Sequence, residues 1–538
     1  MLRAYTAAQV RSAEEPLLAA LGDGLMERAA FGLATVVLRG LKQRRGRVRG
    51  SRVVLLVGAG NNGGDALHAG ALLARRGASV LAVTVAARVH AAGRAALLRA
   101  GGRVVSVAED GADEPVWLGD AVAEAFTADV VLDALVGIGG AGPLRGPARQ
   151  LVAVLSGLIC AEEYGSPWVV AVDVPSGIGV DDGTVVGPVL PAGLTVAFGA
   201  RKPGLLLPPA RELAGHVQVV DIGLVPGLVG GGEPAVASLE TADVAALWPV
   251  PGSRDDKYSR GVLGVVAGSD RFPGAAVLAT SAAVRAGAGM VRYLGPRSAS
   301  LAVLAARPEV VTADGQVQAW LLGPGVDPLD REQADRVEGV LASALDGRPV
   351  PVVVDAGALE LLPETCAEHV VLTPHAGELA RLLAARGRAT ERGAVEAEPL
   401  RFARLASRLT GATILLKGST TIVVSPNGAV LAQGGAPAWL ATAGAGDVLA
   451  GVLGALLAAH GPRVIAEPGL AARLAASAAL VHGRAARRAS AGCASRRGGS
   501  TWSSAVEVAS APLGPISAFD VAEALPGTIA ALLARPAR

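Results

Sequence analysis

The first half of the chain alternates between short apolar runs and helix-like segments. Five runs of branched apolar residues are typical of strands that are buried on both faces of a parallel sheet. They lie at residues 53–57, 80–85, 130–132, 168–172 and 194–198. Between the first two runs, residues 65–76 are rich in Ala and Leu and predict a helix that stops at Gly77. This alternation predicts an α/β domain built on a parallel sheet.

A stretch without periodicity follows these segments. Residues 217–224 predict one last strand, and residues 225–234 are then rich in Gly, Val and Pro. Such a break predicts a domain boundary. We therefore expect a first domain over residues 1–228 and a second over residues 240–538.

Strand-like and helix-like patterns begin again after this boundary. The predicted strands lie at 261–268, 319–322, 351–354, 369–372 and 413–416, with a hairpin over 421–433. Helices are predicted over 275–287 and 520–533, and another opens at Gly446 with an apolar stripe and stops at Gly461. Residues 485–511 are basic and then rich in Ser and Gly, which predicts a flexible insertion.

Composition narrows the function classes. The apolar fraction is 51% and the charged fraction 18% over 538 residues, which fits compact α/β domains rather than disorder. Lys and Arg number 49 against 47 Asp and Glu, so the balance indicates no general attraction to nucleic acid or membranes. Aromatic residues make up only 3%, which argues against a stacking surface for single strands.

The spacing of the cysteines and histidines argues against a disulfide-stabilised fold and against a common type of metal site. Cys160, Cys366 and Cys493 are odd in number and far apart, which excludes a disulfide framework and a CxxC metal site. The seven histidines form no HExxH spacing. The first residues lack an apolar signal core, and no uninterrupted apolar run reaches the roughly 20 residues that span a bilayer. We expect a soluble cytoplasmic protein.

The first glycine-rich loop has the spacing of a dinucleotide fingerprint. Gly58, Gly60 and Gly63 form GxGxxG after a strand and before a helix, which is compatible with a dehydrogenase. That fold needs an acidic residue at the end of the next strand, for the ribose hydroxyls. Here that strand runs into Val85-Ala86-Ala87-Arg88 and has no acid. The loop is also rich in polar side chains, so the dehydrogenase interpretation is the weaker one.

Instead, the loop sequence Asn61-Asn62-Gly63-Gly64-Asp65 resembles the N-terminal domain of the NAD(P)H-hydrate epimerases. Four neighbouring segments resemble further motifs of that family, and together they cover residues 5–224. They are 25–30 (LMERAA), 132–139 (LDALVGIG), 172–177 (VDVPSG) and 200–204 (ARKPG). Ala66 departs from the pattern, because many members have Gly after the Asp.

The resemblance implies a Rossmann-like three-layer α/β/α fold, a K⁺ ion and a set of site residues. Oxygen ligands to K⁺ would come from Asn62, Asp133 and Ser176. Asp173 would contact the substrate, and we expect it to transfer the proton, because inversion at a carbinolamine-like carbon needs an acid or base nearby. The alternative is that Asp133 and Asp173 only cap loops. The other expected substrate contacts are Asn61, Asn62, Gly63, Gly64, Asp65, Gly137, Ile138, Gly139, Gly140, Ala141, Gly142 and Pro143.

A second small-residue loop lies far downstream. Residues 441–447 read Ala-Thr-Ala-Gly-Ala-Gly-Asp and open a helical pattern. Consecutive small residues let main-chain N–H groups converge on an anion, and the helix N-terminus adds partial positive charge. Asp447 could take the proton of a hydroxyl while the amides hold a phosphoryl group. The alternative is an ordinary helix capped by Asp.

Segments around this loop resemble the NAD(P)H-hydrate dehydratases, over residues 245–484 and again over 513–530. The segments are 257–261, 264–269, 285–289, 322–325, 354–359, 372–378 and 416–421. The resemblance implies a ribokinase-like α/β/α fold, with Mg²⁺ and ADP as cofactors. The nucleotide would be held by Lys417, Gly418, Ser419, Thr420, Thr421 and Gly446. The hydrated dinucleotide would contact Ala275, Gly325, His375 and Asp447, with Asp447 as general base. Taken alone, His375 would more often be a packed or capped loop histidine than a site residue.

The two resemblances together predict a bifunctional repair enzyme. The first domain would interconvert the R and S hydrates of NADH or NADPH, and the second would dehydrate the S form at the expense of ADP. We expect a homo-oligomer that binds small molecules only. Two alternatives remain open: a vitamin or sugar kinase fused to a nucleotide-binding domain, or a nonenzymatic NAD-sensing protein.

Overall fold

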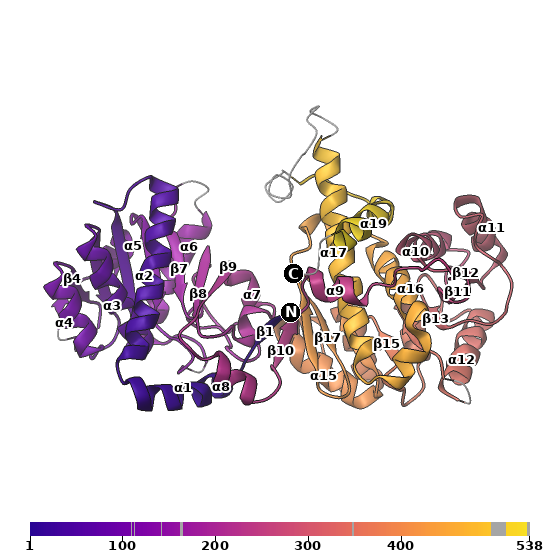
Figure 1. Cartoon of the computed structure of the whole chain (residues 1–538), viewed down its shortest axis with the longest axis horizontal. Helices are drawn as coiled ribbons and strands as arrows, with labels where there is room; N and C mark the ends of the chain where they lie inside the picture. Colours follow the sequence, from indigo (N-terminus) through magenta and orange to yellow (C-terminus); the bar gives the residue numbers. More distant parts are fainter. Residues whose placement is uncertain are drawn as a thin grey trace. The chain divides into compact units, whose positions relative to one another are not determined.

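The computed structural model describes residues 1–108, 110–111, 113–140, 142–161, 165–346, 349–495 and 513–534. The chain divides into two compact units (Figure 1). One comprises Arg3–Val236, and the other comprises Ala237–Arg538 together with Met1–Leu2. Each unit has its own sheet and its own core.

The sheet of the first unit has eight strands in the order β5-β4-β3-β2-β6-β7-β8-β9, and all neighbouring pairs are parallel. The five apolar runs and the last strand predicted from the sequence are confirmed as β2, β3, β6, β7, β8 and β9. The sequence did not predict β4 and β5. The strands are β2 Arg52–Val57, β3 Ser79–Thr84, β4 Arg103–Ser106, β5 Glu114–Pro115, β6 Val130–Ala134, β7 Trp168–Val172, β8 Leu194–Phe198 and β9 His216–Val220.

Helices cover both faces of this sheet, because alternate strand residues point to opposite sides. Val53, Leu55 and Val57 join a core with helices α1, α2 and α3. Val54 and Leu56 join a second core with α5 and α6. The result is the predicted three-layer arrangement. The helices are α1 Ala7–Leu21, α2 Gly24–Arg45, α3 Asn61–Arg75, α4 Ala91–Arg99, α5 Leu118–Phe126, α6 Gly146–Ala161, α7 Ala210–Leu213 and α8 Val225–Gly230, with η1 Pro203–Leu205.

The second unit contains a ten-stranded sheet in the order β1-β10-β18-β17-β16-β15-β14-β13-β11-β12. Strands β11 to β16 pair in parallel, whereas β16, β17 and β18 are antiparallel neighbours, which confirms the predicted hairpin. The strands are β1 Leu2–Ala4, β10 Val236–Ser238, β11 Val262–Val266, β12 Met290–Tyr293, β13 Ala319–Leu322, β14 Val352–Val354, β15 Val370–Leu372, β16 Thr413–Leu416, β17 Thr421–Val424 and β18 Val430–Gln433.

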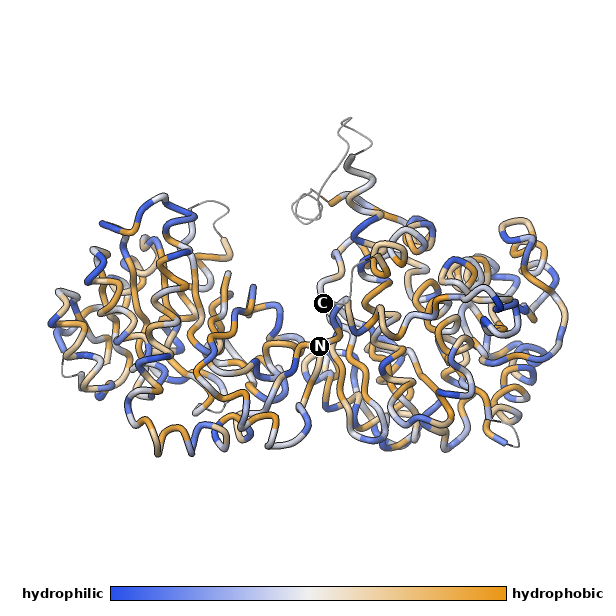
Figure 2. Tube along the Cα trace, in the orientation of Figure 1, coloured by the Kyte–Doolittle hydropathy of each residue, from blue (hydrophilic) through white to orange (hydrophobic). Residues whose placement is uncertain are grey.

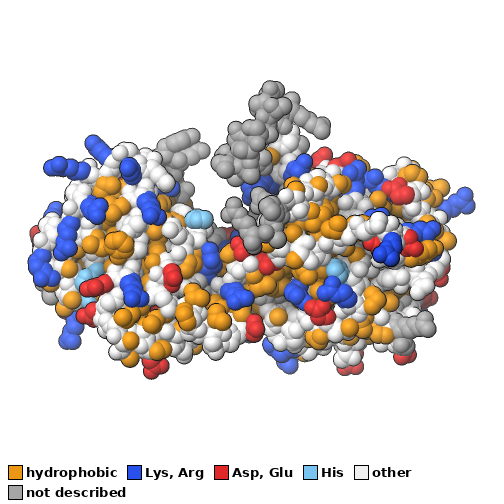
Figure 3. Space-filling model, in the orientation of Figure 1, with side chains coloured by type: hydrophobic (Ala, Val, Ile, Leu, Met, Phe, Trp, Pro, Cys, Tyr) orange, Lys and Arg blue, Asp and Glu red, His pale blue; other side chains and the backbone are white. Residues whose placement is uncertain are grey.

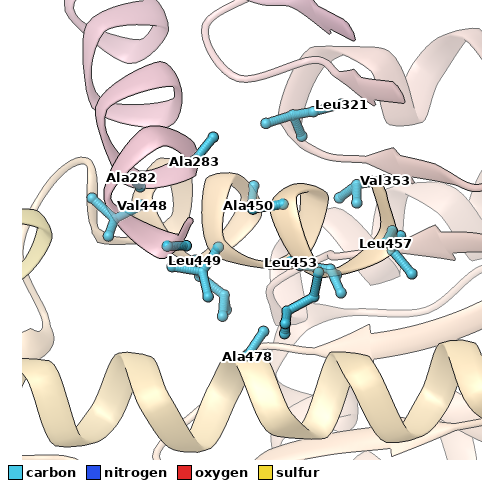
Figure 4. Packing of buried hydrophobic residues seen from close by; sticks show 14 of the residues in the cluster. Ala282, Ala283, Leu321, Val353, Val448, Leu449, Ala450, Leu453, Leu457 and Ala478 are labelled. Carbon is cyan, nitrogen blue, oxygen red and sulfur yellow. The ribbon is translucent and has the colours of Figure 1, made fainter. Parts of the chain in front are cut away.

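Three helices of the second unit, α10, α17 and α19, pack against one long apolar helix, α16. Figure 4 shows Val448 and Leu449 of α16 beside Ala282 of α10, and Leu453 facing Ala478 of α17. The helices are α9 Thr241–Leu247, α10 Pro273–Ala286, α11 Arg297–Ala306, α12 Arg331–Leu345, α13 Ala376–Ala385, α14 Arg392–Ala397, α15 Pro399–Thr410, α16 Ala445–Ala466, α17 Leu470–Ser495 and α19 Ala518–Leu533, with η2 Ala356–Leu361 and η3 Ala438–Leu440.

The hydropathy of the residues matches the arrangement of buried strands and covering helices in both units. In Figure 2 the strands inside each unit are mostly orange, and blue segments lie mainly at loops and helix ends. Among the described residues, α16 is the one helix long and apolar enough to cross a membrane, yet 78% of its apolar window is buried inside the protein, as expected of a core helix. On the face shown in Figure 3, basic and acidic side chains are interspersed over the second unit, in keeping with the nearly balanced charge.

Several boundaries differ from those predicted. Helix α3 begins at Asn61 rather than at 65, and α16 continues past Gly461 to Ala466, with Pro462 inside it. Residues 225–230 form the short helix α8 instead of an irregular linker, because Leu228 is buried in the first core. Residues 485–495 continue α17, with Ala485 and Ala486 fully buried, so they are not part of a flexible insertion. The rest of the expected insertion, 496–511, lies outside the described residues.

Candidate active sites

A cavity of about 540 Å³ lies in the first unit, where the strand order reverses between β2 and β6. In open parallel sheets, ligands bind at such switch points, beyond the carboxyl ends of the strands. The loops after β2 and β6 both line the cavity, as does the residue that follows β7. The residues predicted from sequence that line it are Asn61, Asn62, Asp65, Gly137, Ile138, Gly139, Gly140 and Asp173.

The other predicted contacts of this site lie elsewhere. Gly63 and Gly64 are buried in the first turn of α3 and do not line the cavity. Gly142 and Pro143 are exposed and also lie outside the lining, and Ala141 is outside the described residues. The phosphate-binding stretch predicted over 137–143 is therefore represented in the cavity wall by its first four residues.

Glycines allow two loops to approach each other closely beside the cavity. A Cβ atom on Gly58 would lie 1.9 Å from the carbonyl oxygen of Leu135, and one on Gly63 would lie 2.5 Å from that of Gly58. The backbone therefore turns directly into α3, whose N-cap is Gly60. The first N–H groups of this helix have no partner within the helix, so they can receive an anion.

Asp133, at the end of β6, is tied to the loop after β7. Its Oδ2 atom accepts a hydrogen bond of 2.8 Å from the N–H of Ser176, and the Oγ atom of Ser176 accepts one of 2.9 Å from the N–H of Val136. Asp133 is 1% exposed, and burial raises its pKa despite these hydrogen bonds. Two of the three predicted K⁺ ligands are thus in direct contact.

The third predicted ligand, Asn62, lies against the loop after β6. A Cβ atom on Gly137 would be 3.0 Å from the Cγ atom of Asn62. The Nδ2 atom of Asn62 is buried without a hydrogen-bond partner. Because the two ends of an amide are assigned rather than observed, a rotated Asn62 places a free oxygen at this position. Among the described residues, no group of three or more His, Cys, Asp and Glu side chains is suited to a metal ion.

Asp173 forms a buried ion pair that sequence reasoning missed. Its Oδ1 atom accepts hydrogen bonds from the N–H of Phe198, at 3.0 Å, and from the Nζ atom of Lys202. Lys202 is 1% exposed and also donates to the carbonyl oxygen of Phe198, at 3.0 Å. Asp173 has a φ angle of +68°, which is uncommon for a residue other than glycine. The sequence of residues 200–204 resembles a family motif, but the sequence alone indicates no role for Lys202.

Asp65 lies in the same cavity in a different environment. Burial raises the pKa of its carboxyl group well above the ordinary value; the negative charges of Asp173 and Glu14 raise it further, and Lys202 opposes them. Glu14, on α1, also lines the cavity, and burial raises its pKa too. Three carboxyl groups therefore line the cavity, and the buried ammonium group of Lys202 is paired with one of them, Asp173.

The second unit collects its polar side chains at the carboxyl ends of the adjacent strands β14, β15 and β16. Lys417 follows β16, and its Nζ atom lies 2.7 Å from Oδ1 of Asp355 and 3.6 Å from Oε2 of Glu378. A Cβ atom on Gly446 would be 3.4 Å from that same Nζ atom. Lys417 therefore lies between two carboxylates and the N-terminus of α16. Sequence reasoning gave Asp355 and Glu378 no role, although both belong to quoted motifs.

Asp447 lies in the first turn of α16 beside this cluster. Burial raises the pKa of its carboxyl group from 3.8 to about 7, with a further increase from Asp355 and Glu378 and a decrease from Lys417. Burial lowers the pKa of Lys417, but Asp355 and Glu378 outweigh it, so the net shift is upward. Lys417 therefore keeps its charge, while Asp447 can gain or lose a proton near neutral pH.

His375 precedes α13 and caps that helix. Its Nδ1 atom accepts hydrogen bonds of 3.0 Å from Gly377 and 3.2 Å from Glu378. This is the capping role that the alternative interpretation of His375 expected. The residue also forms a bridge to Lys417, so it lies at the edge of the charged cluster. Its side chain is half exposed, and its Nε2 atom lies 3.4 Å from Oε1 of Glu378.

The remaining predicted residues of the second unit fall into two places. Ala275 and Gly325 touch each other near the switch point between β11 and β13, because a Cβ atom on Gly325 would lie 2.6 Å from that of Ala275. Gly418 and Ser419 are exposed, Thr420 is buried and Thr421 is half-buried, in the turn that joins β16 to β17.

Comparisons with known proteins match both units. Residues 22–204 match the family model described as YjeF-related protein N-terminus, and residues 263–497 match the one described as NAD(P)H-hydrate dehydratase. The bifunctional NAD(P)H-hydrate repair enzyme Nnr of Mycobacterium tuberculosis is 46% identical over 473 residues, which cover 85% of this chain and 89% of that protein.

Two further similarities concern one unit each. The NAD(P)H-hydrate epimerase of Clavibacter michiganensis is 47% identical over 229 residues, which cover 41% of this chain and 90% of that protein. The solved structure of the ADP/ATP-dependent NAD(P)H-hydrate dehydratase of Bacillus subtilis, co-crystallized with ATP/Mg²⁺, is 22% identical. It covers 55% of this chain and 99% of that chain, with a TM-score of 0.44.

Proposed function

This chain belongs to the family of bifunctional NAD(P)H-hydrate repair enzymes, with an epimerase domain before a dehydratase domain, and we propose here which residues carry the two activities. The first unit interconverts the R and S hydrates of NAD(P)H, and the second removes water from the S hydrate. The dehydrogenase interpretation of the first glycine loop does not apply. The observation that carries the proposal is the position of Asp447 beside Lys417 at the N-terminus of α16.

In the second unit, Asp447 is the general base. Its pKa of about 7 lets it accept a proton at neutral pH and release it again. It takes the proton from the substrate hydroxyl as that oxygen attacks the terminal phosphorus of ADP, and AMP leaves as the phosphorus–oxygen bond that joins it to that phosphorus breaks. The N–H groups at the start of α16 and the ammonium group of Lys417 stabilise the charge of the transferred group. Phosphate then leaves with the former hydroxyl oxygen, and loss of the neighbouring ring proton restores the double bond.

Mg²⁺ fits this arrangement without a preformed cage. Such an ion is commonly held by one or two carboxylates together with the substrate phosphates. Glu378 would supply such an oxygen, Asp447 would stay free to act as the base, and the bound ion would neutralise phosphate charge. We propose ADP as the phosphate donor, with Lys417, Gly446 and the turn at 418–421 holding it. His375, Ala275 and Gly325 would contact the hydrated dinucleotide.

In the first unit, K⁺ fits next to Asp133 and Ser176. The ion prefers oxygen ligands, and the buried amide of Asn62, which has no partner, supplies a third oxygen once rotated. Bound there, the ion would hold the loop after β6 against the start of α3. The substrate phosphates would meet the N–H groups of Asn61 and Asn62, and Asp173 would act as a base toward the hydrated ring.

The direct test supplies a mixture of NADH-hydrate epimers, ADP and Mg²⁺, and follows the absorbance of regenerated NADH. Recovery of the whole mixture is expected. Asp447→Asn should still bind ADP with an unchanged dissociation constant but should lose NADH recovery. Unchanged turnover in that variant would remove Asp447 from the base role. A stable phosphoester on a free alcohol would instead support a small-molecule kinase.

The expected homo-oligomer and the cytoplasmic location stay predictions. Sedimentation of the purified chain at several concentrations measures the first. Fractionation of the native cells measures the second.

A further inference from the structure

The two aspartates of the epimerase cavity, Asp65 and Asp173, lie in contrasting surroundings. Both line the cavity of about 540 Å³ at the switch point of the sheet. Asp173 is held by a salt bridge to Lys202 and by the N–H of Phe198. The Asp65 side chain has no hydrogen-bond partner among the described residues and is 9% exposed. Pairs of carboxyl groups held in different environments are typical of acid and base partners.

Lys202 fixes the position of Asp173 from behind. Its Nζ atom bridges the carboxylate of Asp173 and the carbonyl oxygen of Phe198, and only 1% of the residue is exposed. Asp173 itself has a left-handed backbone conformation, with φ of +68°, which costs free energy unless the surroundings hold it. The ion pair therefore orients one carboxylate oxygen toward Lys202 and leaves the other free.

Asp65 has no structural task that explains its burial. It is the fifth residue of α3, whose N-cap is Gly60, and no side chain caps this helix. Burying a carboxyl group without a partner is costly. The charged groups that face it are Glu14 from α1, Asp173 after β7 and Lys202 after β8. The first two disfavour a second negative charge in the cavity, so Asp65 retains its proton more readily than an exposed aspartate does.

We propose that Asp65 is a second catalytic residue of the epimerase site, an acid that works with Asp173 as base, and that Lys202 is the positioning residue for this pair. The inference rests on the proposed epimerase function of the first unit. It adds a proton donor to a site in which only the base had been assigned.

Asp65 and Asp173 together account for the proton transfers that epimerisation needs. Asp65 donates its proton to the hydroxyl on the hydrated ring carbon, and the carbon–oxygen bond breaks with its electron pair, releasing water. The lone pair of the ring nitrogen forms the double bond of a planar iminium ion. A water molecule then adds to the other face and gives its proton to Asp173. Proton exchange with solvent returns Asp65 and Asp173 to their starting states, and the opposite direction uses them in exchanged roles.

The test uses the full chain and one purified hydrate epimer without nucleotide, so that the dehydratase domain is silent. The change in the epimer ratio is followed by chromatography against an enzyme-free blank. Asp65→Asn keeps the shape of the side chain but cannot donate a proton as an acid. Asp120→Asn, on the exposed surface of α5, is the matched control. ADP-driven dehydration of the S hydrate checks the second domain in every variant.

For Asp65→Asn we expect a loss of at least about a hundredfold in kcat, with little change in KM. Lys202→Met should also lower kcat, and Lys202→Arg should restore part of it, because the paired charge returns. Full epimerase activity in Asp65→Asn overturns the inference. So does a loss that appears only as a raised KM. If the unchanged protein does not accelerate epimerisation at all, the proposed function fails instead.

A measurement on the unchanged protein tests the inference even if a variant does not fold. An NMR titration of the aspartate carboxyl carbons should show, for Asp65, a carboxyl group that keeps its proton to a higher pH than exposed aspartates do. Asp65→Asn or Asp65→Ala, in whichever variant folds, should remove that signal. If neither substitution removes a carboxyl signal that titrates above the range of exposed aspartates, Asp65 is not the acid.

Discussion

The pH dependence of dehydration tests the environment of Asp447 most directly. Burial and the nearby carboxylates raise the pKa of Asp447 from 3.8 to about 7. A shift of about 3 units corresponds to a penalty on the order of 4 kcal/mol for the ionised form relative to water. The base must be ionised to act, so about half of the enzyme is active at pH 7 and about one tenth at pH 6. The rate should therefore fall about tenfold per unit below neutrality and level off above about pH 8.

The Glu378→Gln substitution removes a negative charge near Asp447 with little change in the shape of the side chain. Glu378 raises the pKa of Asp447, and its Oε2 atom accepts the N–H of His375 at 2.8 Å, which a glutamine oxygen can also do. Removing the negative charge should lower the pKa of Asp447 by roughly 0.5–1 unit. The acid side of the profile then moves to lower pH, and the rate at pH 6 increases relative to its own plateau.

The assay measures kcat/KM for the purified S hydrate in the presence of ADP and Mg²⁺, from NADH absorbance, with an enzyme-free blank at each pH. ADP affinity is measured in parallel, because Glu378 lies beside Lys417. Two results would refute the reasoning. One is a profile without an inflection between pH 6 and pH 8 in the unchanged protein. The other is an acid side that moves to higher pH in Glu378→Gln.

Three other predictions follow from contacts in the two sites. Gly63→Ala places a methyl group 2.5 Å from a main-chain oxygen, so thermal unfolding should show a loss of about 1–3 kcal/mol, whereas Gly60→Ala meets nothing within 4 Å and should keep its stability. Lys417→Met leaves the carboxylate of Asp355 buried without its partner at 2.7 Å and should lower the free energy of unfolding by about 3 kcal/mol in urea; an unchanged midpoint would contradict this. Asn62→Ala should raise the K⁺ concentration needed for half-maximal epimerase rate, and an unchanged K⁺ response would remove Asn62 from the ion site.

Much of the fold was predictable because its strands are buried on both faces. Such strands appear as apolar runs whatever lies around them, and the runs at 130–132, 168–172 and 194–198 correspond to strands β6, β7 and β8. Helix boundaries were less predictable. Helix α16 passes through Pro462 to Ala466, and Val464 is buried beyond the glycine that looked like a stop.

The candidate sites were predictable as loops but not as charge networks. The small residues that let backbones approach, such as Gly58 and Gly63, lie within one short segment of the chain, so their spacing carried the signal. The side chains that pair with the acids are instead far from them in the sequence. Lys202 is 29 residues from Asp173, and Lys417 is 62 residues from Asp355. No local pattern links such residues.

The sequence by itself determined two α/β units and the loops that hold the polar groups, since periodicity and glycine spacing are local properties of the chain. Only the tertiary structure decided which acids are buried, which are paired and which can hold a proton near neutral pH. The reason is that burial and the distance between charges depend on strands that meet only after folding. Asp65, in the first turns of α3, and Asp173, after β7, line the same cavity, yet only Asp173 forms an ion pair with an ammonium group.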